Sequence, residues 1–221
     1  MAAEPHATPA ACLETIQLEH VPPTHSVNVA VFRDVENAEF LQQQLLGRNS
    51  EFEYAFIDAT SIISRLQVLA AIYKAITVHI GGTMKTPNIH SEIVWSLSPN
   101  NNISEAYRRY GITASSRHII VVKILLLLPV SPTSPSLSSS SPSLLTPEAA
   151  AVQSHLRTHV RGRPCPFADD VLASFTDWPK VRKYYKLNGV AHLDALKDKD
   201  ERLRRRESEM LVLGSMALKG L

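Results

Sequence analysis

Hydrophobic and polar positions alternate along several short segments with the two-residue period of β-strands. Residues 13–18 and 27–32 show this alternation, and residues 54–57 form a third short apolar segment. The β-branched run at residues 116–128 predicts a strand that is buried on both faces. Residues 89–97 are also predicted as a strand. Together these segments predict a small β-sheet.

Helical spacing is clearest between Ser64 and Ile80. Its apolar positions are three or four residues apart and predict one buried stripe, made of Leu66, Leu69, Tyr73, Ile76 and Ile80. We therefore expect Gln67, Lys74 and Thr77 to face solvent or a partner. Further helices are predicted at residues 36–46, 103–110, 148–161, 168–175, 178–185 and 193–211.

This order of elements predicts an α+β (mixed α/β) fold, in which a small β-sheet packs against several helices. We expect a single domain over residues 12–221. Residues 129–147 are rich in serine and proline and predict a flexible insertion, while residues 1–11 are expected to be disordered. The apolar tail at residues 213–221 is expected to dock on the domain.

The composition, with 44% hydrophobic and 20% charged residues in 221, is typical of a globular protein. The formal net charge is only +2. The charges are nevertheless distributed unevenly: acidic residues dominate positions 1–58, whereas positions 62–123 contain seven basic and two acidic residues. This asymmetry permits a basic face for an anionic partner.

Several classes of protein are excluded by simple features of the chain. Cys12 and Cys165 are the only cysteines and are far apart, which excludes a disulfide scaffold, a zinc finger and an iron–sulfur site. The longest apolar run, at residues 119–128, is too short for a membrane span, and the first residues do not resemble a signal peptide. We therefore expect a soluble intracellular protein without a membrane partner.

No motif indicates catalysis or cofactor binding. Residues 81–86 look like a phosphate loop, but Met84 stands where the Walker pattern needs glycine. His155 and His159 are four residues apart, as metal ligands on a helix would be, yet no third ligand is evident. We therefore predict no catalytic residue, no metal site and no cofactor. A nucleotide-dependent enzyme that uses the 81–86 turn is the weakest alternative.

Two basic segments lie in the last quarter of the chain. Residues 178–186 interleave four cations with aromatic residues, a composition that suits phosphate contact and base stacking. The favoured interpretation is an amphipathic helix whose core side chains are Trp178, Val181, Tyr184 and Tyr185. Residues 197–206 mix both charges and predict a solvated helix face.

The middle of the chain resembles a known family, and the most specific similarity lies between residues 84 and 112. The matching motifs are Met84-Lys85-Thr86, Ser91-Glu92-Ile93-Val94, residues 97–106 and Gly111-Ile112. Weaker similarity is found at residues 32–35 and 216–220. These motifs resemble the PRPK-binding protein family, the kinase-binding subunit of the KEOPS (EKC) complex. The insertion at residues 129–147 departs from the family pattern.

The resemblance implies a non-catalytic subunit that binds the amino-terminal lobe of a small atypical kinase-like ATPase, and through it the other KEOPS subunits. It also implies a role in making threonylcarbamoyladenosine in ANN-decoding tRNAs, including capture of the tRNA with its 3′ CCA end. We accordingly expect the protein in the nucleus and cytoplasm. The alternative is a pure scaffold that regulates the kinase and never touches RNA.

Two sets of residues are candidates for these contacts. Because positions 62–123 are basic, we predict an RNA surface that includes Lys74, His79, Lys85 and Thr86, with Asn88 beside it. A protein interface has an apolar centre, so we predict that the kinase is contacted by surface residues near the carboxy terminus. The candidates are Met210, Leu211 and Met216, which could equally belong to the core.

Overall fold

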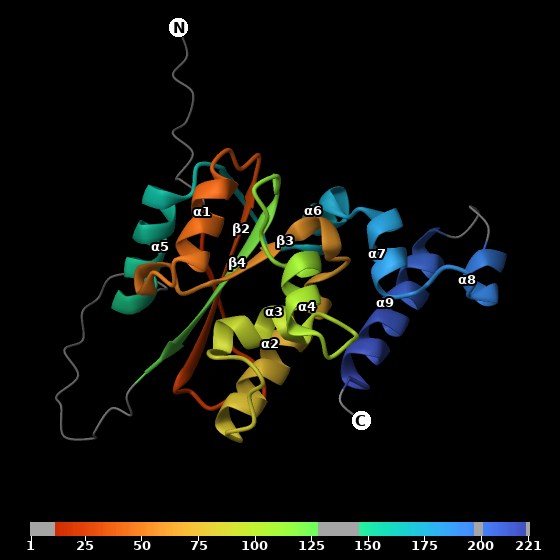
Figure 1. Ribbon diagram of the computed structural model, residues 1–221, viewed down its shortest axis with the longest axis horizontal. Helices are drawn as coiled ribbons and strands as arrows, with labels where there is room; N and C mark the ends of the chain where they lie inside the picture. The colour runs from red at the N-terminus through yellow and green to blue at the C-terminus, as the bar shows by residue number, and fades with distance from the viewer. Residues whose placement is uncertain (1–11, 128–145, 197–200, 220–221) are drawn as a thin grey trace, which may run out of the picture.

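The computed structural model describes residues 12–127, 146–196 and 201–219 (Figure 1). The predicted disorder at residues 1–11 therefore lies outside the described residues, as does most of the predicted insertion at 129–147. Its last two residues, Thr146 and Pro147, belong instead to the start of a helix, because the Thr146 side chain accepts a hydrogen bond from the N–H of Ala149. The α+β fold is confirmed.

The sheet is antiparallel and has the strand order β1-β2-β4-β3. Its strands are β1 (Glu14–Ile16), β2 (His25–Arg33), β3 (Ala55–Asp58) and β4 (Ile119–Leu126). A short strand, β5 (Arg163–Cys165), pairs with the other end of β2 along the edge that β1 also uses. As a result β2 and β4 are central, and β3 is the outermost strand on its side.

Helices cover both faces of this sheet (Figure 1). Along β2, Val27, Val29 and Val31 pack on one face, while Ala30 and Phe32 pack on the other. The first face is covered by α2 (Arg65–Ile80), α3 (Ile89–Ser96), α4 (Ile103–Tyr110), α6 (Asp169–Phe175), α7 (Trp178–Tyr184), α8 (Ala191–Ala195) and α9 (Glu201–Ala217). The second face is covered by α1 (Ala38–Leu46), the short 3-10 helix η1 (Ser50–Phe52) and α5 (Pro147–His159). Another 3-10 turn, η2 (Ala59–Ser61), follows β3.

The strand predicted at residues 89–97 is wrong, because this segment forms α3. The Asn88 side chain accepts a hydrogen bond from the N–H of Ser91 at 2.8 Å and so caps the first turn. Ile89, Ile93 and Leu97 are four residues apart and all are buried, which is helical spacing. The cap and this spacing outweigh the strand preference of the β-branched residues.

The buried face of α2 also differs from the predicted stripe. Leu66, Tyr73 and Ile80 are 51%, 42% and 53% exposed, whereas Gln67 is fully buried and donates a hydrogen bond to the Tyr185 hydroxyl at 2.8 Å. The side chains that pack in the core are Val68, Ala71, Ile72, Ala75 and Ile76. An apolar row with a seven-residue spacing therefore lies on the surface of α2.

The carboxy-terminal segment forms two helices rather than the single one predicted at residues 193–211. Helix α8 ends at Ala195, and α9 begins at Glu201 and continues to Ala217. Val212, Met216 and Lys219 are buried, so the described part of the tail is docked as expected. Lys74 of α2 holds this end of α9, because its Nζ donates hydrogen bonds to the carbonyl oxygens of Met216 and Lys219.

Candidate functional site

A groove of about 740 Å³ opens beside β3, where the sheet ends. One wall comes from α1 and η1, and the other comes from α3 and α4. These two sets of helices pack on opposite faces of the sheet. Residues 111–112 pair with the outer edge of β3, through the Ile112 N–H and the Phe56 carbonyl oxygen. A volume of this size falls within the range of about 300–1,000 Å³ that is typical of ligand sites.

Gly111 makes this close pairing possible. A Cβ atom at this position would lie only 2.6 Å from the carbonyl oxygen of Tyr107, so any side chain would collide with the last turn of α4. Glycine therefore lets the chain leave α4 and turn directly back to β3. The groove wall and the sheet edge are thus fixed relative to each other.

The groove has an apolar floor and a polar rim. Phe52, Tyr54 and Phe56 are buried beneath it, and Tyr107 is half-buried on the wall. Polar side chains surround this floor, among them two cations, two amides, a hydroxyl and a carboxylate, from Arg48, Arg108, Asn49, Asn88, Ser91 and Glu53. Such a combination suits a planar, partly apolar ligand with negatively charged or hydrogen-bonding groups at its edges.

His90 lines the groove, and its Nδ1 is buried. Its side chain is buried, and its Nε2 accepts the N–H of Ile124 at 3.1 Å. Burial lowers the pKa of His90 to about 3, with a smaller contribution from the charge of Lys123, so the ring is neutral at pH 7. A neutral ring whose Nε2 accepts must carry its hydrogen on Nδ1. Nδ1 has no hydrogen-bond partner among the described residues and lies 3.9 Å from the Glu53 carboxylate.

The turn at residues 84–86 is held by a buried carboxylate. Glu92 Oε2 accepts hydrogen bonds from the N–H of Lys85 at 3.1 Å, from the N–H of Thr86 at 2.9 Å and from the Thr86 hydroxyl at 2.6 Å. These amides are therefore not available to a phosphate, which argues against the phosphate-loop alternative. Pro87 and Asn88, which follow the turn, line the groove.

The structure does not bring the four predicted RNA-binding residues together on one exposed surface. Lys74 is half-buried against α9, so the expectation that it faces solvent or a partner is wrong. Thr86 is buried against Glu92, and Nδ1 of His79 lies 3.3 Å from Nε2 of His25. Lys85 is exposed, three residues before Asn88 on the groove wall. Their contact with RNA stays a prediction, for which Lys85 is the best-placed residue.

The three predicted kinase-binding residues also differ in their exposure to solvent. Met210 is 62% exposed, Leu211 is half-buried, and Met216 is 4% exposed and belongs to the core. Met216 is therefore not a surface residue, contrary to its proposed role, because α9 turns this side chain into the core, where the helix packs beside α2.

Exposed apolar side chains lie on both α2 and α9. We define the α2–α9 surface by Leu66, Tyr73 and Ile80 of α2 together with Met210 of α9 and Leu218 just beyond it. The bonds of Lys74 to the carbonyl oxygens of Met216 and Lys219 bring the end of α9 beside the middle of α2. Exposed apolar residues on neighbouring helices suit a protein-binding surface.

The sequence analysis did not identify the groove residues Phe52, Tyr54, His90 and Tyr107. The family-like motifs between residues 84 and 112 were an available signal, since Asn88, Ser91, Tyr107 and Gly111 of that stretch all line the groove. No sequence signal connected them with η1 and β3, which lie at least 30 residues earlier.

Other kinds of site are not found in the part of the chain that the structure describes. No three His, Cys, Asp or Glu side chains gather to hold a metal ion there. His155 instead bonds through Nδ1 to the Tyr54 hydroxyl at 2.9 Å, and both His155 and His159 pack on Phe52. No helix within these residues has the length and hydropathy to cross a membrane.

The α+β fold thus carries two separate candidate binding surfaces, a groove and an exposed apolar surface. Comparison with known families agrees, because a family model described as kinase binding protein CGI-121 matches residues 32–220. This chain belongs to that family. The resemblance seen in the motifs between residues 84 and 112 is confirmed.

Curated relatives cover almost the whole chain. The "EKC/KEOPS complex subunit cgi121" of Neurospora crassa is 52% identical over 213 residues, which are 95% of this chain and 99% of the relative. The "EKC/KEOPS complex subunit CGI121" of Gibberella zeae is 49% identical over 209 residues, again 95% and 99% of the two chains. The subunit of Schizosaccharomyces pombe is 34% identical over 166 residues, which are 75% of this chain and 84% of the relative.

Proposed function

We propose that this protein is a non-catalytic subunit of an EKC/KEOPS complex, that it binds the small kinase-like ATPase of the complex, and that it helps to capture tRNA for threonylcarbamoyladenosine modification. The relatives are named as subunits of this complex, and the family is described as kinase-binding. Such a subunit acts in the nucleus and cytoplasm. The observation that carries the RNA role is the groove.

The groove suits the single-stranded 3′ end of a tRNA. A single strand is held by cations near its phosphates and by surfaces on which its bases stack. Arg48 and Arg108 lie at the rim, and Tyr107 offers a half-buried ring on the wall. About 740 Å³ accommodates one or two nucleotides rather than a duplex.

Binding of the full chain to tRNA with and without its CCA end tests the RNA role. We expect the wild-type chain to prefer the complete tRNA, and Tyr107→Ala to remove most of that preference because stacking on one aromatic ring contributes about 1–3 kcal/mol. Arg161 is an exposed cation just after α5. Arg161→Glu makes the same charge change as Lys85→Glu and is therefore its matched control. Equal affinity for both tRNAs would contradict capture of the 3′ end and favour the alternative, a pure scaffold that regulates the kinase.

The α2–α9 surface suits the kinase. Its apolar side chains are exposed without a described partner, and protein interfaces are depleted in charge at their centre. Tyr73 and Met210 are the best anchors, because aromatic residues and methionine are enriched in interfaces. Tyr73→Asp and Met210→Asp should abolish co-purification with the kinase. Leu126→Asp, at an equally exposed apolar position on β4, should leave co-purification unchanged.

A further inference from the structure

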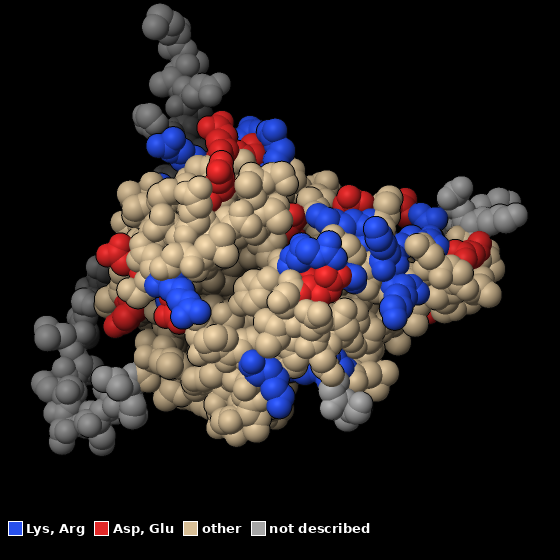
Figure 2. All heavy atoms as spheres, in the orientation of Figure 1, with Lys and Arg blue, Asp and Glu red and all other residues tan. Residues whose placement is uncertain are grey.

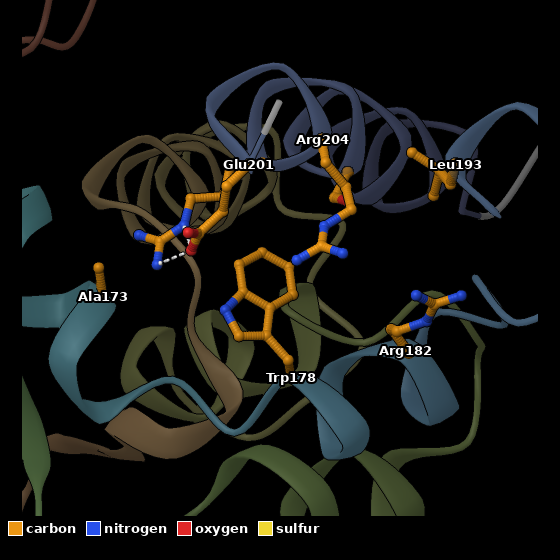
Figure 3. Close-up of a pocket in the computed structure, with 8 residues that line it drawn as sticks. Ala173, Trp178, Arg182, Leu193, Glu201 and Arg204 are labelled. Atoms are coloured by element: carbon orange, nitrogen blue, oxygen red, sulfur yellow. Dashed lines mark hydrogen bonds and ion pairs between the residues drawn. The ribbon is translucent and has the colours of Figure 1, made fainter. Parts of the chain in front are cut away.

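A small cleft lies between α7, α8 and α9, away from the groove (Figure 3). Its volume is about 210 Å³, and it is lined by Ala173, Trp178, Arg182, Leu193, Glu201, Arg204, Arg205 and Ser208. In Figure 3 the Trp178 indole points from α7 toward α9, and Arg204 points from α9 back toward the indole. We call this the α7–α9 cleft.

Three guanidinium groups and one carboxylate line the α7–α9 cleft, which makes it basic. Arg205 bonds to Glu201 at 2.8 Å, and its Cζ lies 5.9 Å from the centre of the Trp178 ring. Arg182 bonds to Asp194 at 2.6 Å. These pairs are partly or largely exposed, and exposed ion pairs are weak and exchange partners readily. An incoming anion can therefore share these guanidinium groups.

The size of the cleft selects the kind of anion. A volume of about 210 Å³ lies below the range of ligand sites, so the cleft cannot enclose a nucleotide. It accommodates a single phosphate group, whose oxygens match the paired N–H donors of arginine. The contact of Arg205 with the Trp178 ring helps to hold this guanidinium group at the cleft.

Further cations connect the cleft with the face that carries the groove. Lys183 and Lys186 are exposed at the end of α7, and Arg109 of α4 lies with its Cζ 5.0 Å from the centre of the Tyr184 ring. Figure 2 shows that Lys and Arg side chains gather over α4 and α7 on one face of the molecule. Arg108, at the groove rim, belongs to the same helix as Arg109.

We infer that the α7–α9 cleft binds a phosphate group of the RNA backbone, outside the groove and independently of the 3′ end. This inference rests on the proposed RNA role. The cations of α4 and α7 guide the backbone from the groove to the cleft, and the contact is with phosphate rather than with bases. It therefore adds affinity and salt dependence without sequence preference.

The test measures binding of the full chain to two RNA hairpins at several salt concentrations, one with a single-stranded CCA tail and one blunt. Arg205→Glu should weaken binding of both hairpins by roughly tenfold and lower the salt slope by about one. Arg206→Glu makes the same charge change one residue away, outside the cleft, and should have a much smaller effect. Because Arg205→Glu places two carboxylates near each other, a double variant, Arg182→Gln with Arg205→Gln, provides a version without repulsion.

The outcomes separate this inference from the proposed function. Tyr107→Ala should weaken binding of the tailed hairpin alone, because it alters the groove. If the cleft variants match Arg206→Glu on both hairpins while Tyr107→Ala still acts, the cleft inference is rejected and the groove proposal stands. If the cleft variants spare RNA but prevent co-purification with the kinase, the cleft is a protein surface and the inference is overturned. Failure of the wild-type chain to bind either hairpin would reject the RNA role and this inference together.

Discussion

The groove and the α2–α9 surface differ in how the fold makes them. The groove is concave and lies where the sheet ends, so its aromatic floor and the buried ring of His90 are fixed by strand pairing. The α2–α9 surface is made of apolar side chains that stand away from the core, and its shape depends on how α9 docks on α2. A rigid concave site selects a small chemical group, whereas an exposed apolar surface fits another folded protein. Substitutions that keep the fold should therefore affect one partner at a time.

The largest expected effect is a difference in the free energy of unfolding between substitutions on the buried side and on the exposed side of α9. Met216→Asp places a charge in the core and should lower the free energy of unfolding by about 4 kcal/mol or more. Met210→Asp, six residues earlier on the exposed side, should change it by less than about 0.5 kcal/mol while still preventing kinase binding. Chemical denaturation and co-purification measure the two properties. Similar destabilisation by both variants would contradict the orientation of α9.

Removal of the buried carboxylate under the 84–86 turn should have the next largest effect. Glu92 accepts three hydrogen bonds from Lys85 and Thr86, so Glu92→Ala leaves buried donors without a partner. We expect the free energy of unfolding to fall by about 3 kcal/mol in denaturation experiments. Glu92→Gln retains an acceptor oxygen and should lose less. Equal loss in the two variants would show that the charge, not hydrogen-bond acceptance, holds the turn.

The groove also predicts that the stability of the fold depends on pH below pH 7. His90 has its pKa lowered to about 3 in the folded chain, against about 6.5 when unfolded. Below pH 6.5 the unfolded chain takes up a proton at His90 that the folded chain does not. The contribution of His90 to the free energy of unfolding is therefore fully present above pH 6.5 and is lost as the pH drops toward 3. The slope attributable to this residue is at most about 1.4 kcal/mol per pH unit. In denaturation series from pH 7 to pH 4, His90→Gln should have a smaller slope than the wild type; an unchanged slope would contradict a buried neutral ring.

The strands and most helices could be predicted from the sequence because their spacing is local information. Asn102 and Glu105 predicted a helix at residues 103–110, and the structure shows the Asn102 side chain accepting the N–H of Glu105. The strand predicted at 89–97 is wrong because the Asn88 side chain caps a helix there, which outweighs the strand preference of the β-branched residues. Spacing also misled on α2, where two apolar rows exist and tertiary packing chose the one with Ala71 and Ala75.

The candidate sites were less predictable because their residues meet only in the folded chain. Exposure of Lys74 could not be judged without knowing that α9 ends beside it. The groove joins His90 with η1 and β3, a pairing that depends on β3 being the outermost strand. Lys85 was placed correctly on the surface because a turn after a helix stop is exposed whatever the tertiary structure.

The smallest expected effect distinguishes Lys74 from Lys85, which were both predicted to contact RNA. Lys74→Met removes the donor that binds the carbonyl oxygens of Met216 and Lys219, and should lower the free energy of unfolding by about 1 kcal/mol. It should leave RNA affinity unchanged, because the Lys74 Nζ faces α9. Lys85→Met should behave in the opposite way, with unchanged stability and a salt slope of RNA binding reduced by about one. Denaturation and RNA titration of the two single variants decide between them, and an RNA defect in Lys74→Met without loss of stability would return this residue to the RNA surface.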